Sequence, residues 1–537
     1  MRRQIGSKKV RLFVISIWLL LSAGVSRAAV EQWGIFEASF PGPATGNPFV
    51  DVEFSARFTS RQSVFDVQGF YDGDGIYRIR FMPPSQGQWR FETHSNQPQL
   101  SGKIGEFSCE KPSAQNHGPV RIANTFHFVY ADGTPFVPIG TTCYAWVHQP
   151  EALEDQTLAT LKTSPFNKVR MCLFPSHYTP GKDDPLFFPF LGTPPKQLDF
   201  TRFNVEFFRH LEKRIGDLRD QGIQADLILF HPYDKGQMGL DAMGAANDDR
   251  YVRYAVARLS AYRNIWWSMA NEFDLIKTKT DADWDRLFQI VQTEDPSGHL
   301  RSIHNSQRIY DPAKPWITHL SIQNAMAVED FGRADLYREV CRKPVVYDEV
   351  HYEGNLDRRW GQLSGEEMVH RFWQGTIAGT YVGHGEVLSK PGGGAWTSVG
   401  GELIGQSPPR IAFLKTIMEA GPAEGIEPID RFYETHIGGQ SGEYYLIYFG
   451  KETPTQWVFS LPKDRLTAGM QFKVEILDTW NMTVTPVDAI FSIVKHSNYL
   501  FHAEGEQKVA LPGRPYIALR IQRIGGEKPV ESIKDGE

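Results

Sequence analysis

The sequence has 537 residues, of which 41% are hydrophobic and 13% aromatic, a composition typical of a well-packed soluble protein and not of a disordered one. A chain of this length exceeds one ordinary hydrophobic core, so about three domains are expected. The formal net charge of −6 provides no basic surface for phosphate groups, which argues against nucleic acid as a partner.

The first 29 residues have the pattern of a secretory signal peptide. Five basic residues precede "LFVISIWLLLSAGV", 14 mostly apolar residues that are followed by "SRAA". A basic start, an apolar segment and a small-residue cleavage site are the three parts of such a signal. We expect the mature protein to begin near Ala29 or Val30, to be secreted or periplasmic, and to have no membrane association after cleavage. An uncleaved anchor is the less favoured alternative, because 14 residues are too few to span a bilayer comfortably.

The four cysteines, Cys109, Cys143, Cys172 and Cys341, are too few for a disulfide framework in a chain of this size. Three of them lie in apolar, strand-like segments, where a buried free thiol is usual, although one bridge remains open. They lack the C-x-x-C spacing of a zinc site. We expect neither a metal nor a cofactor.

Residues 30–118 are predicted to form an all-β domain. "PFVDVEFSARFTS" mixes alternation with β-forming residues, and "YDGDGIYRIRFMPPSQGQWRFETHS" is typical of strand, Pro/Gly turn and strand. Short strands at this spacing indicate a small β-sandwich.

Residues 119–425 alternate short apolar segments with longer amphipathic stretches such as "FNVEFFRHLEKRIGDLRDQG". Eight strand candidates within roughly 300 residues match the number that a (β/α)8 TIM barrel needs. A doubly wound open sheet is the alternative, disfavoured because no Gly-rich phosphate loop follows the first strand. The candidates are "FVPIGTTCY", "FNKVRMCLF", "IQADLILF", "NIWWSMANE", "LRSIH", "ITHLSIQ", "PVVYDEV" and "GTYVGHGE".

Residues 426–525 return to β patterning, with segments such as "EYYLIYFG" and "PYIALRIQRI", and are predicted to form a second small β-sandwich. The polar tail, residues 526–537, is predicted to be disordered. The fold class is therefore α/β, a barrel flanked by an N-terminal and a C-terminal β-sandwich.

Function in such a barrel is expected at the carboxyl ends of its strands. Aromatic, histidine and carboxylate residues gather there, which describes a polar cleft with stacking surfaces, suited to sugars. The residues at or just beyond these ends are Tyr144, Trp146, Arg170, His177, Tyr178, His231, Tyr233, Asn271, Glu272, His304, His319, Glu349, His384 and Trp396.

Two of these residues are candidates for catalysis. Glu272 follows "WWSMAN" and shares strand parity with small residues that suit a barrel interior, and Glu349 ends "PVVYDE" with Asp348 expected on the opposite face. Two glutamates across the mouth match the pair of a retaining glycosidase, whose carboxyl groups lie about 5 Å apart.

The motifs "MANE" and "YDE" in this order resemble the catalytic signatures of the retaining clan-A glycoside hydrolases. Most of residues 30–525 also resembles bacterial multidomain proteins with a DUF5060-type β-sandwich, an apiosidase-like (DUF4038-type) barrel and a DUF5605-type β-domain. The segments that carry this resemblance are "DGTPFVPIGTTCYAW", "FNKVRMCLF", "NIWWSMANEFD", "PVVYDEVHYEG" and "GTYVGHGE".

The resemblance implies that Glu272 is the acid/base and Glu349 the nucleophile. It further implies that Asn271 binds the sugar 2-hydroxyl and that Arg170 bonds the nucleophile. His319 is the nearest candidate for the strand-6 partner of the nucleophile, and Trp396 for a sugar-stacking platform. The remaining residues expected to bind substrate are His231, Tyr233, Tyr144 and Trp146.

Simpler interpretations remain open for each site residue. Asn271 and Glu272 could cap the next helix, and Glu349 could pair with Arg342 or Lys343. Arg170 could belong to a structural ion pair.

Other residues also have competing interpretations. Asp348 and Glu353 are rival nucleophiles. Histidines such as His231 and His319 are often structural, and Trp266 and Trp267 suit a core. Residues 179–198 form an unusually long loop, read here as a cleft rim, with a plain surface insertion as the alternative.

We therefore expect an exported retaining glycoside hydrolase that acts, without a cofactor, on oligosaccharides or polysaccharides of plant or algal origin. The apiosidase resemblance makes a pectin side chain a plausible substrate, although barrels keep a catalytic pair while their loops change specificity. A non-catalytic carbohydrate-binding protein and an inverting hydrolase are the alternatives.

Overall fold

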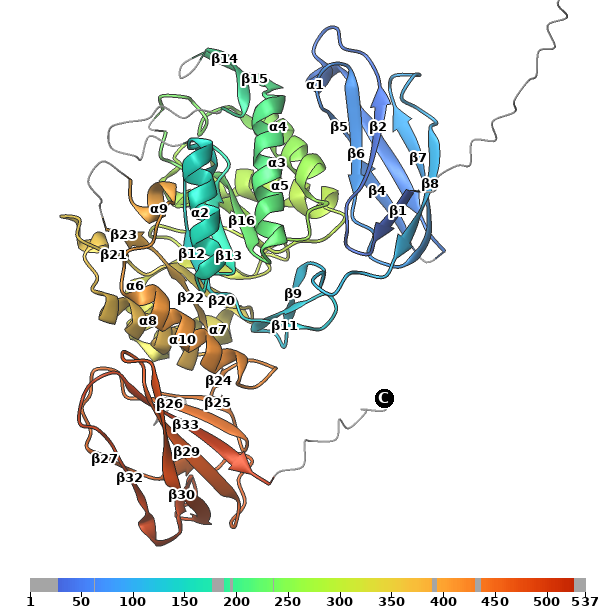
Figure 1. Cartoon of the computed structure of the whole chain (residues 1–537). Helices are drawn as coiled ribbons and strands as arrows, with labels where there is room; N and C mark the ends of the chain where they lie inside the picture. Colours follow the sequence, from blue (N-terminus) through green and yellow to red (C-terminus); the bar gives the residue numbers. More distant parts are fainter. Residues whose placement is uncertain are drawn as a thin grey trace, which may run out of the picture.

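The computed structural model describes residues 28–525 except 62, 176–187, 194–196, 235, 389–393 and 430–435. Figure 1 shows an N-terminal β-domain in blue, a central barrel surrounded by helices, and a C-terminal β-domain in orange and red. All of the predicted signal peptide but its last two residues, and all of the predicted tail, lie outside the described residues.

The N-terminal domain is a sandwich of two sheets. Alternation in β3 buries Phe54, Ala56 and Phe58, and the Phe58 ring stacks on Phe81 of the facing sheet, with ring centroids 4.3 Å apart. The first sheet has the order β1 (Ala28–Glu31), β8 (Ile104–Glu110), β7 (Gly87–Ser95), β3 (Phe54–Thr59) and β4 (Val64–Gln68). The second has the order β2 (Phe36–Pro41), β6 (Ile76–Phe81) and β5 (Phe70–Tyr71), and α1 (Pro48–Asp51) lies between β2 and β3 in the chain.

The central region is a closed barrel of eight parallel strands, which confirms the predicted fold class and rules out an open sheet. A parallel bridge between His304 and Ser321 joins the fifth and sixth strands and closes the ring. In chain order the strands are β12 (Gly140–Thr142), β13 (Lys168–Cys172), β16 (Gln224–Phe230), β17 (Ile265–Ala270), β18 (Arg301–Ser302), β19 (Leu320–Gln323), β20 (Val345–Glu349) and β22 (Tyr381–His384).

Helices surround the barrel, as the apolar and polar pattern of the connecting segments predicts. The fifth and sixth strands are the exception: residues 303–319, all of them described, contain no helix. The helices are α2 (Glu151–Thr163), α3 (Val205–Asp220), α4 (Ala245–Leu259), α5 (Asp281–Glu294), α6 (Ala325–Glu329), α7 (Phe331–Cys341), α8 (Gly365–Ile377), α9 (Trp396–Val399) and α10 (Ser407–Glu419).

A three-stranded sheet covers the amino ends of the barrel strands. It consists of β9 (Val120–Ala123), β10 (His127–Tyr130) and β11 (Pro135–Phe136), and Phe128 packs on Trp266, with ring centroids 5.1 Å apart. Trp266 and Trp267 are buried in the core. The opposite end of the barrel, where the strands finish, remains for the site.

Buried charges join the N-terminal domain to the barrel. Arg258 of α4 pairs with Asp72, which follows β5, at 2.9 Å, and with Glu212 of α3 at 2.5 Å. Arg80 of β6 also pairs with Glu212, at 2.7 Å. Figure 1 shows the N-terminal domain beside this flank of the barrel.

The C-terminal domain packs its large sheet against α8. Trp373 stacks on Tyr448, with centroids 5.4 Å apart, and His370 lies 2.9 Å from the Tyr448 hydroxyl. The sheet has the order β24 (Glu427–Pro428), β25 (Ile437–Gln440), β26 (Tyr444–Tyr448), β33 (Ile517–Ile524), β29 (Gln471–Asp478), β30 (Thr483–Lys495), β31 (Leu500–Ala503) and β28 (Ser460–Pro462). A second, two-stranded sheet pairs β27 (Gln456–Val458) with β32 (Lys508–Ala510).

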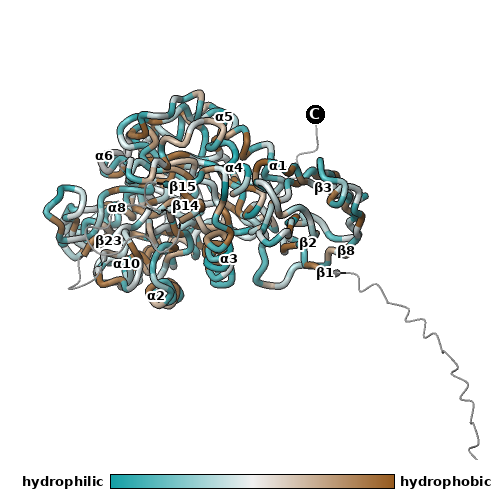
Figure 2. Tube along the Cα trace, turned by 90° about the horizontal axis from the view of Figure 1, so that it is seen from above, coloured by the Kyte–Doolittle hydropathy of each residue, from teal (hydrophilic) through white to brown (hydrophobic). Residues whose placement is uncertain are grey.

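Hydrophobic stretches, brown in Figure 2, gather in the middle of the barrel region. Within the residues that the structure describes, no helix combines the length and the apolar character needed to cross a membrane. All four cysteines are free thiols, and Cys109, Cys143 and Cys172 are buried.

Candidate active site

Two glutamates meet at the carboxyl ends of the barrel strands. Glu349 is the last residue of β20, and Glu272 follows β17 after Asn271. The side-chain nitrogen of Gln323, the last residue of β19, lies 2.5 Å from Glu349 Oε2 and 3.2 Å from Glu272 Oε1. A single amide therefore contacts both carboxylates.

This bridge limits how far apart the two carboxylates can lie. The two oxygens cannot be separated by more than the sum of their distances to the shared nitrogen. The separation of this one pair of oxygens is compatible with the ~5–5.5 Å between the carboxyl groups of retaining glycosidases.

Glu349 is surrounded by hydrogen-bond donors and is only 6% exposed. The Tyr144 hydroxyl donates to Oε1, and the amide nitrogen of Asn271 lies 3.3 Å from the same oxygen. Arg170 Nη1 and His304 Nε2 lie 3.7 and 3.5 Å from it. These contacts hold the carboxylate in one orientation.

Glu272 occupies a different environment from Glu349. Tyr233 donates a hydrogen bond of 2.8 Å to its Oε2 and also accepts one from Asn271. The backbone of Glu272 has φ 44° and ψ 49°, in the left-handed region that residues other than glycine rarely adopt. Such strain is concentrated at functional sites in proteins.

The two carboxyl groups have opposite pKa shifts. Burial and the adjacent charge of Glu349 raise the pKa of Glu272. Burial also acts to raise the pKa of Glu349, but the charges of His304 and Arg170 and the Tyr144 hydrogen bond outweigh it, so that this pKa is lowered. Burial lowers the pKa of His304 to about 4, so His304 contributes positive charge only in acid, and Arg170 is the cation beside Glu349 at pH 7.

Arg170 belongs both to the site and to a buried ion network. Its Nη2 donates a 2.8 Å hydrogen bond to Asn271, while its Nε lies 3.6 Å from Asp226 and 3.8 Å from Asp348. Lys168 pairs with both aspartates, at 2.7 and 2.8 Å. Arg170 therefore contacts the nucleophile candidate and also takes part in a structural ion network, so both interpretations of this residue apply.

The strand-parity argument for Glu349 is corrected by the structure. Asp348 faces the barrel interior, where it pairs with Lys168, whereas Tyr347 shares its surroundings with Tyr337 and Cys341 of α7. Strict alternation would turn Glu349 toward α7 as well. It reaches the mouth because it ends the strand, where the register with β19 shifts between Ser321 and Gln323.

His231 supports the site from behind Tyr233. The two rings stack with centroids 5.1 Å apart, and the Tyr233 backbone N–H donates to His231 Nδ1 at 3.1 Å. His231 Nε2 lies 3.1 Å from the Phe174 carbonyl oxygen. Tyr144, Arg170, Tyr233 and Asn271 therefore gather with the glutamates, and His231 positions one of them.

Three residues expected to bind substrate lie elsewhere. Trp146 is fully buried and donates to the Glu154 carbonyl, and Trp396 is 1% exposed and donates to Thr141 Oγ1 at 2.8 Å. His319 lies between Phe128 and Trp266 near the amino ends of the strands, and burial lowers its pKa to about 3. Neither tryptophan has a free face for sugar, and His319 is not the partner of the nucleophile.

The rival carboxylates have structural roles. Glu353 accepts hydrogen bonds from the backbone N–H groups of Gln406 and Ser407 at the start of α10. Asp348 is held by Lys168 and Ser321. Neither is directed at Glu272.

Gln323 and Tyr352 are the contacts that sequence reasoning missed. Gln323 ends the sixth strand candidate, so its position at a strand end could have identified it. The family resemblance instead indicates His319, earlier in the same segment, as the partner of the nucleophile. Tyr352 lies 3.5 Å from the Tyr144 hydroxyl and also bonds Glu349. It follows the seventh strand by three residues, in a segment for which no pattern predicts a direction.

Two residues expected in the cleft, His177 and Tyr178, lie outside the described residues, as does most of the loop 179–198. Among its described residues, 190–193 form β14 (Phe190–Thr193), which pairs antiparallel with β15 (Gln197–Phe203).

Two groups of histidine and carboxylate side chains in the described residues are close enough to share a metal ion, and neither contains Glu272 or Glu349. One is buried and consists of Glu353, His384 and Glu386, and the other consists of His496, His502 and Glu506.

Three family models match the chain in succession. They are DUF5060 over residues 29–96, the apiosidase-like catalytic domain over 123–385, and DUF5605 over 433–522. Both candidate glutamates fall within the second match. No curated protein matches the chain.

Solved structures give a more extensive likeness. A candidate glycoside hydrolase from Bacteroides vulgatus ATCC 8482 is 42% identical, with a TM-score of 0.90, over 93% of this chain and 100% of that one. A family 5 glycoside hydrolase from the same strain has a TM-score of 0.55 at 14% identity, over 76% of this chain and 94% of that one, which shows a shared fold only. This chain, in which an apiosidase-like catalytic domain stands between DUF5060 and DUF5605 domains, therefore belongs to the family of that candidate glycoside hydrolase.

Proposed function

We propose that the protein is a retaining glycoside hydrolase that uses Glu349 as nucleophile and Glu272 as acid and base. The observation that carries this proposal is the pair of carboxylates bound to one Gln323 amide, because that spacing leaves little room for a water between them. The opposite pKa shifts of the two groups agree with these roles.

In the first step the protonated form of Glu272, which the raised pKa favours, gives its proton to the glycosidic oxygen. The bond between that oxygen and the anomeric carbon breaks, and a carboxylate oxygen of Glu349 bonds to the carbon. Asn271 contacts Glu349 and the Tyr233 hydroxyl that binds Glu272, which supports a role for Asn271 in binding a sugar hydroxyl during this step.

The second step releases the sugar. Once Glu349 is esterified it no longer carries the charge that raises the pKa of Glu272, so Glu272 becomes an effective base. It takes a proton from water, the water oxygen bonds to the anomeric carbon, and the Glu349 carboxylate leaves. Two inversions give net retention.

We further propose that the substrate is a plant or algal glycan and that the protein is exported. The apiosidase-like match supports the substrate class, and the basic and apolar start of the chain supports export. Amino-terminal sequencing of the protein from its native host tests the second point. A start near residue 30 is expected, and a mature protein that keeps residues 1–29 contradicts it.

The proposed activity is tested on a panel of aryl glycosides and of plant and algal oligosaccharides. The wild-type protein is expected to hydrolyse at least one of them with retained configuration in the first product, measured by proton NMR. Glu349→Gln should abolish this turnover, and the control Glu92→Gln, at a β7 glutamate whose side chain is 44% exposed, should not change it. Binding without hydrolysis of every ligand would favour a carbohydrate-binding protein, and inverted product would exclude the retaining mechanism.

A further inference from the structure

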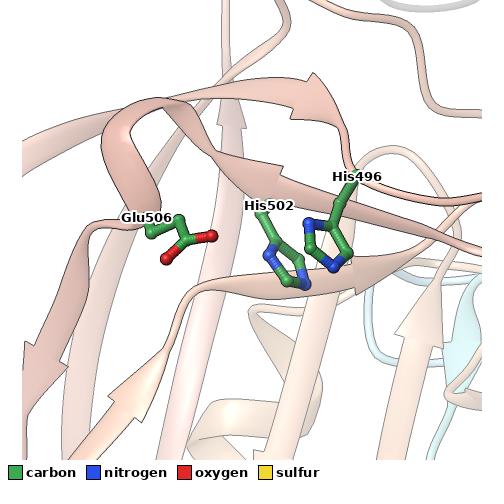
Figure 3. Close-up of side chains that lie close together, drawn as sticks. All are labelled: His496, His502 and Glu506. Atoms are coloured by element: carbon green, nitrogen blue, oxygen red, sulfur yellow. The ribbon is translucent and has the colours of Figure 1, made fainter.

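A group of three metal-ligating side chains lies on the C-terminal domain, away from the glutamate pair. His496 follows β30, His502 belongs to β31, and Glu506 ends the short helix η4 (Glu504–Glu506). Figure 3 shows the two imidazole rings side by side with the carboxylate next to them. One ligand atom from each of the three residues lies within 4.8 Å of the others.

The backbone explains why these residues meet. His502 pairs with Val494 across the β30–β31 ladder, so His496, two residues further along, lies on the same face. The imidazole rings lie 3.6 Å apart at 11°. Gly505 and Glu506 have φ values of 72° and 52°, and these two left-handed residues turn the chain so that Glu506 comes back beside His502.

The three side chains have unused ligand atoms. Among the described residues, no hydrogen-bond or ion-pair partner contacts either imidazole ring or the Glu506 carboxylate. The Nδ1 atom of His502 is also buried. A buried nitrogen without a hydrogen-bond partner costs free energy, which a bound metal ion would recover.

We propose that His496, His502 and Glu506 bind a divalent transition-metal ion of the zinc class. Two imidazoles and one carboxylate are a donor set that Zn²⁺ and Co²⁺ accept, with water completing the coordination. In a tetrahedral site with bonds of ~2.0–2.1 Å the ligand atoms lie about 3.3 Å apart. His496 and Glu506 are exposed, so rotations of their side chains can close the remaining distance.

The buried group of Glu353, His384 and Glu386 is a weaker candidate for a metal site. The carboxylate oxygens of Glu353 and Glu386 accept backbone N–H groups of residues 404–407, at 2.6 to 3.1 Å. These hydrogen bonds hold the loop before α10 and already occupy the oxygens. The exposed group therefore remains the candidate, and its expected effect is to fasten η4 to the β30–β31 hairpin.

The test is titration of chelator-treated, tag-free protein with Co²⁺ and Zn²⁺, followed by calorimetry and by the visible spectrum of Co²⁺. One ion per chain is expected, with the affinity reduced at least tenfold in His496→Ala and in His502→Ala and several-fold in Glu506→Gln. His94→Ala, an exposed histidine of β7, is the control and should bind as the wild type does.

Thermal unfolding provides a second readout, because an ion bound only to the folded state stabilises it. Zn²⁺ should raise the Tm of the wild type and of His94→Ala but not of His496→Ala, whose exposed position makes the substitution compatible with folding. The proposal is overturned if the wild type binds no ion stoichiometrically, or if the His496 and His502 variants retain wild-type affinity.

Discussion

Glu272 and Glu349 carry the same functional group in neighbouring positions, yet the proposed reaction needs one protonated and the other ionised. Burial acts on both. The difference comes from their partners: Arg170 and Tyr144 stabilise the ionised form of Glu349, whereas Glu272 faces the negative charge of Glu349. Each role therefore follows from the neighbours of the carboxyl group and not from its type.

The pH dependence of kcat/KM should reflect this difference. Activity is lost in acid as Glu349 becomes protonated, and because its pKa is lowered the acidic limb should lie below the ordinary glutamate value of about 4.3. Activity is lost in base as Glu272 loses its proton, and the raised pKa places that limb above the same value. Glu272→Gln, assayed on an activated aryl glycoside, should lack the basic limb. If the limb persists in that variant, Glu272 is not the acid.

Gln323 is expected to position both carboxylates. Gln323→Leu removes one donor from each of them and should lower kcat by about 10²-fold, the typical effect of deleting one well-placed donor. Its hydrogen bond lowers the pKa of Glu272, so the basic limb should also move to higher pH. Gln471→Leu, on the C-terminal domain, is the control. A loss of kcat without any movement of the basic limb would indicate a merely structural role.

The carboxyl ends of the barrel strands determine which residues can meet at the site. The eight apolar segments, the order of the strands and the meeting of residues from the first, second, third, fourth and seventh strand ends could all be predicted, because a parallel barrel brings those ends together. The orientation of individual side chains could not. Trp146 and Trp396 follow strand ends as Tyr144 does, but η1 (Trp146–His148) and α9 turn them into the core. Glu349 reaches the mouth through a register shift that no local pattern encodes.

The contact between β5, α3 and α4 should contribute strongly to stability. Arg258→Met leaves the buried carboxylates of Asp72 and Glu212 without one of their cations, and removing one member of a buried pair typically costs about 3–5 kcal/mol. The free energy of unfolding in urea should fall accordingly. Arg57→Met breaks the exposed pair with Asp66 and should leave that free energy nearly unchanged. Equal effects of the two substitutions would contradict this account of the interface.

The molecule consists of three regions, but the boundaries of its hydrophobic cores do not coincide with the boundaries of these regions. The N-terminal sandwich and the outer part of the C-terminal domain have cores of their own. The barrel core includes Phe70 of β5 and continues into the C-terminal domain through Tyr444, Leu446 and Tyr448 of β26. Composition and strand patterns predict the three regions, but they do not predict which faces are shared, because that depends on contacts between distant segments.

The shared core predicts that the barrel and the C-terminal domain unfold together. Tyr448→Ala removes the ring that stacks on Trp373 and should destabilise both by about 3–5 kcal/mol, as for other large aromatic residues. Calorimetry should show one transition for these two regions, moved to lower temperature. Tyr499→Ala, at a residue that is 63% exposed, should change it little. Two separate transitions for the barrel and the C-terminal domain would contradict the shared core.

The division of labour between the two glutamates is tested most directly by azide rescue on an aryl glycoside with a good leaving group. In Glu272→Ala the first step survives, but water lacks its base, so azide, which needs none, should restore turnover and give a glycosyl azide of retained configuration. In Glu349→Ala azide should replace the missing nucleophile and give the inverted product. The configurations of the two azides, measured by NMR, decide the assignment. Exchanged configurations would mean that the two roles are swapped, and full activity of both alanine variants without azide would show that the reaction takes place elsewhere.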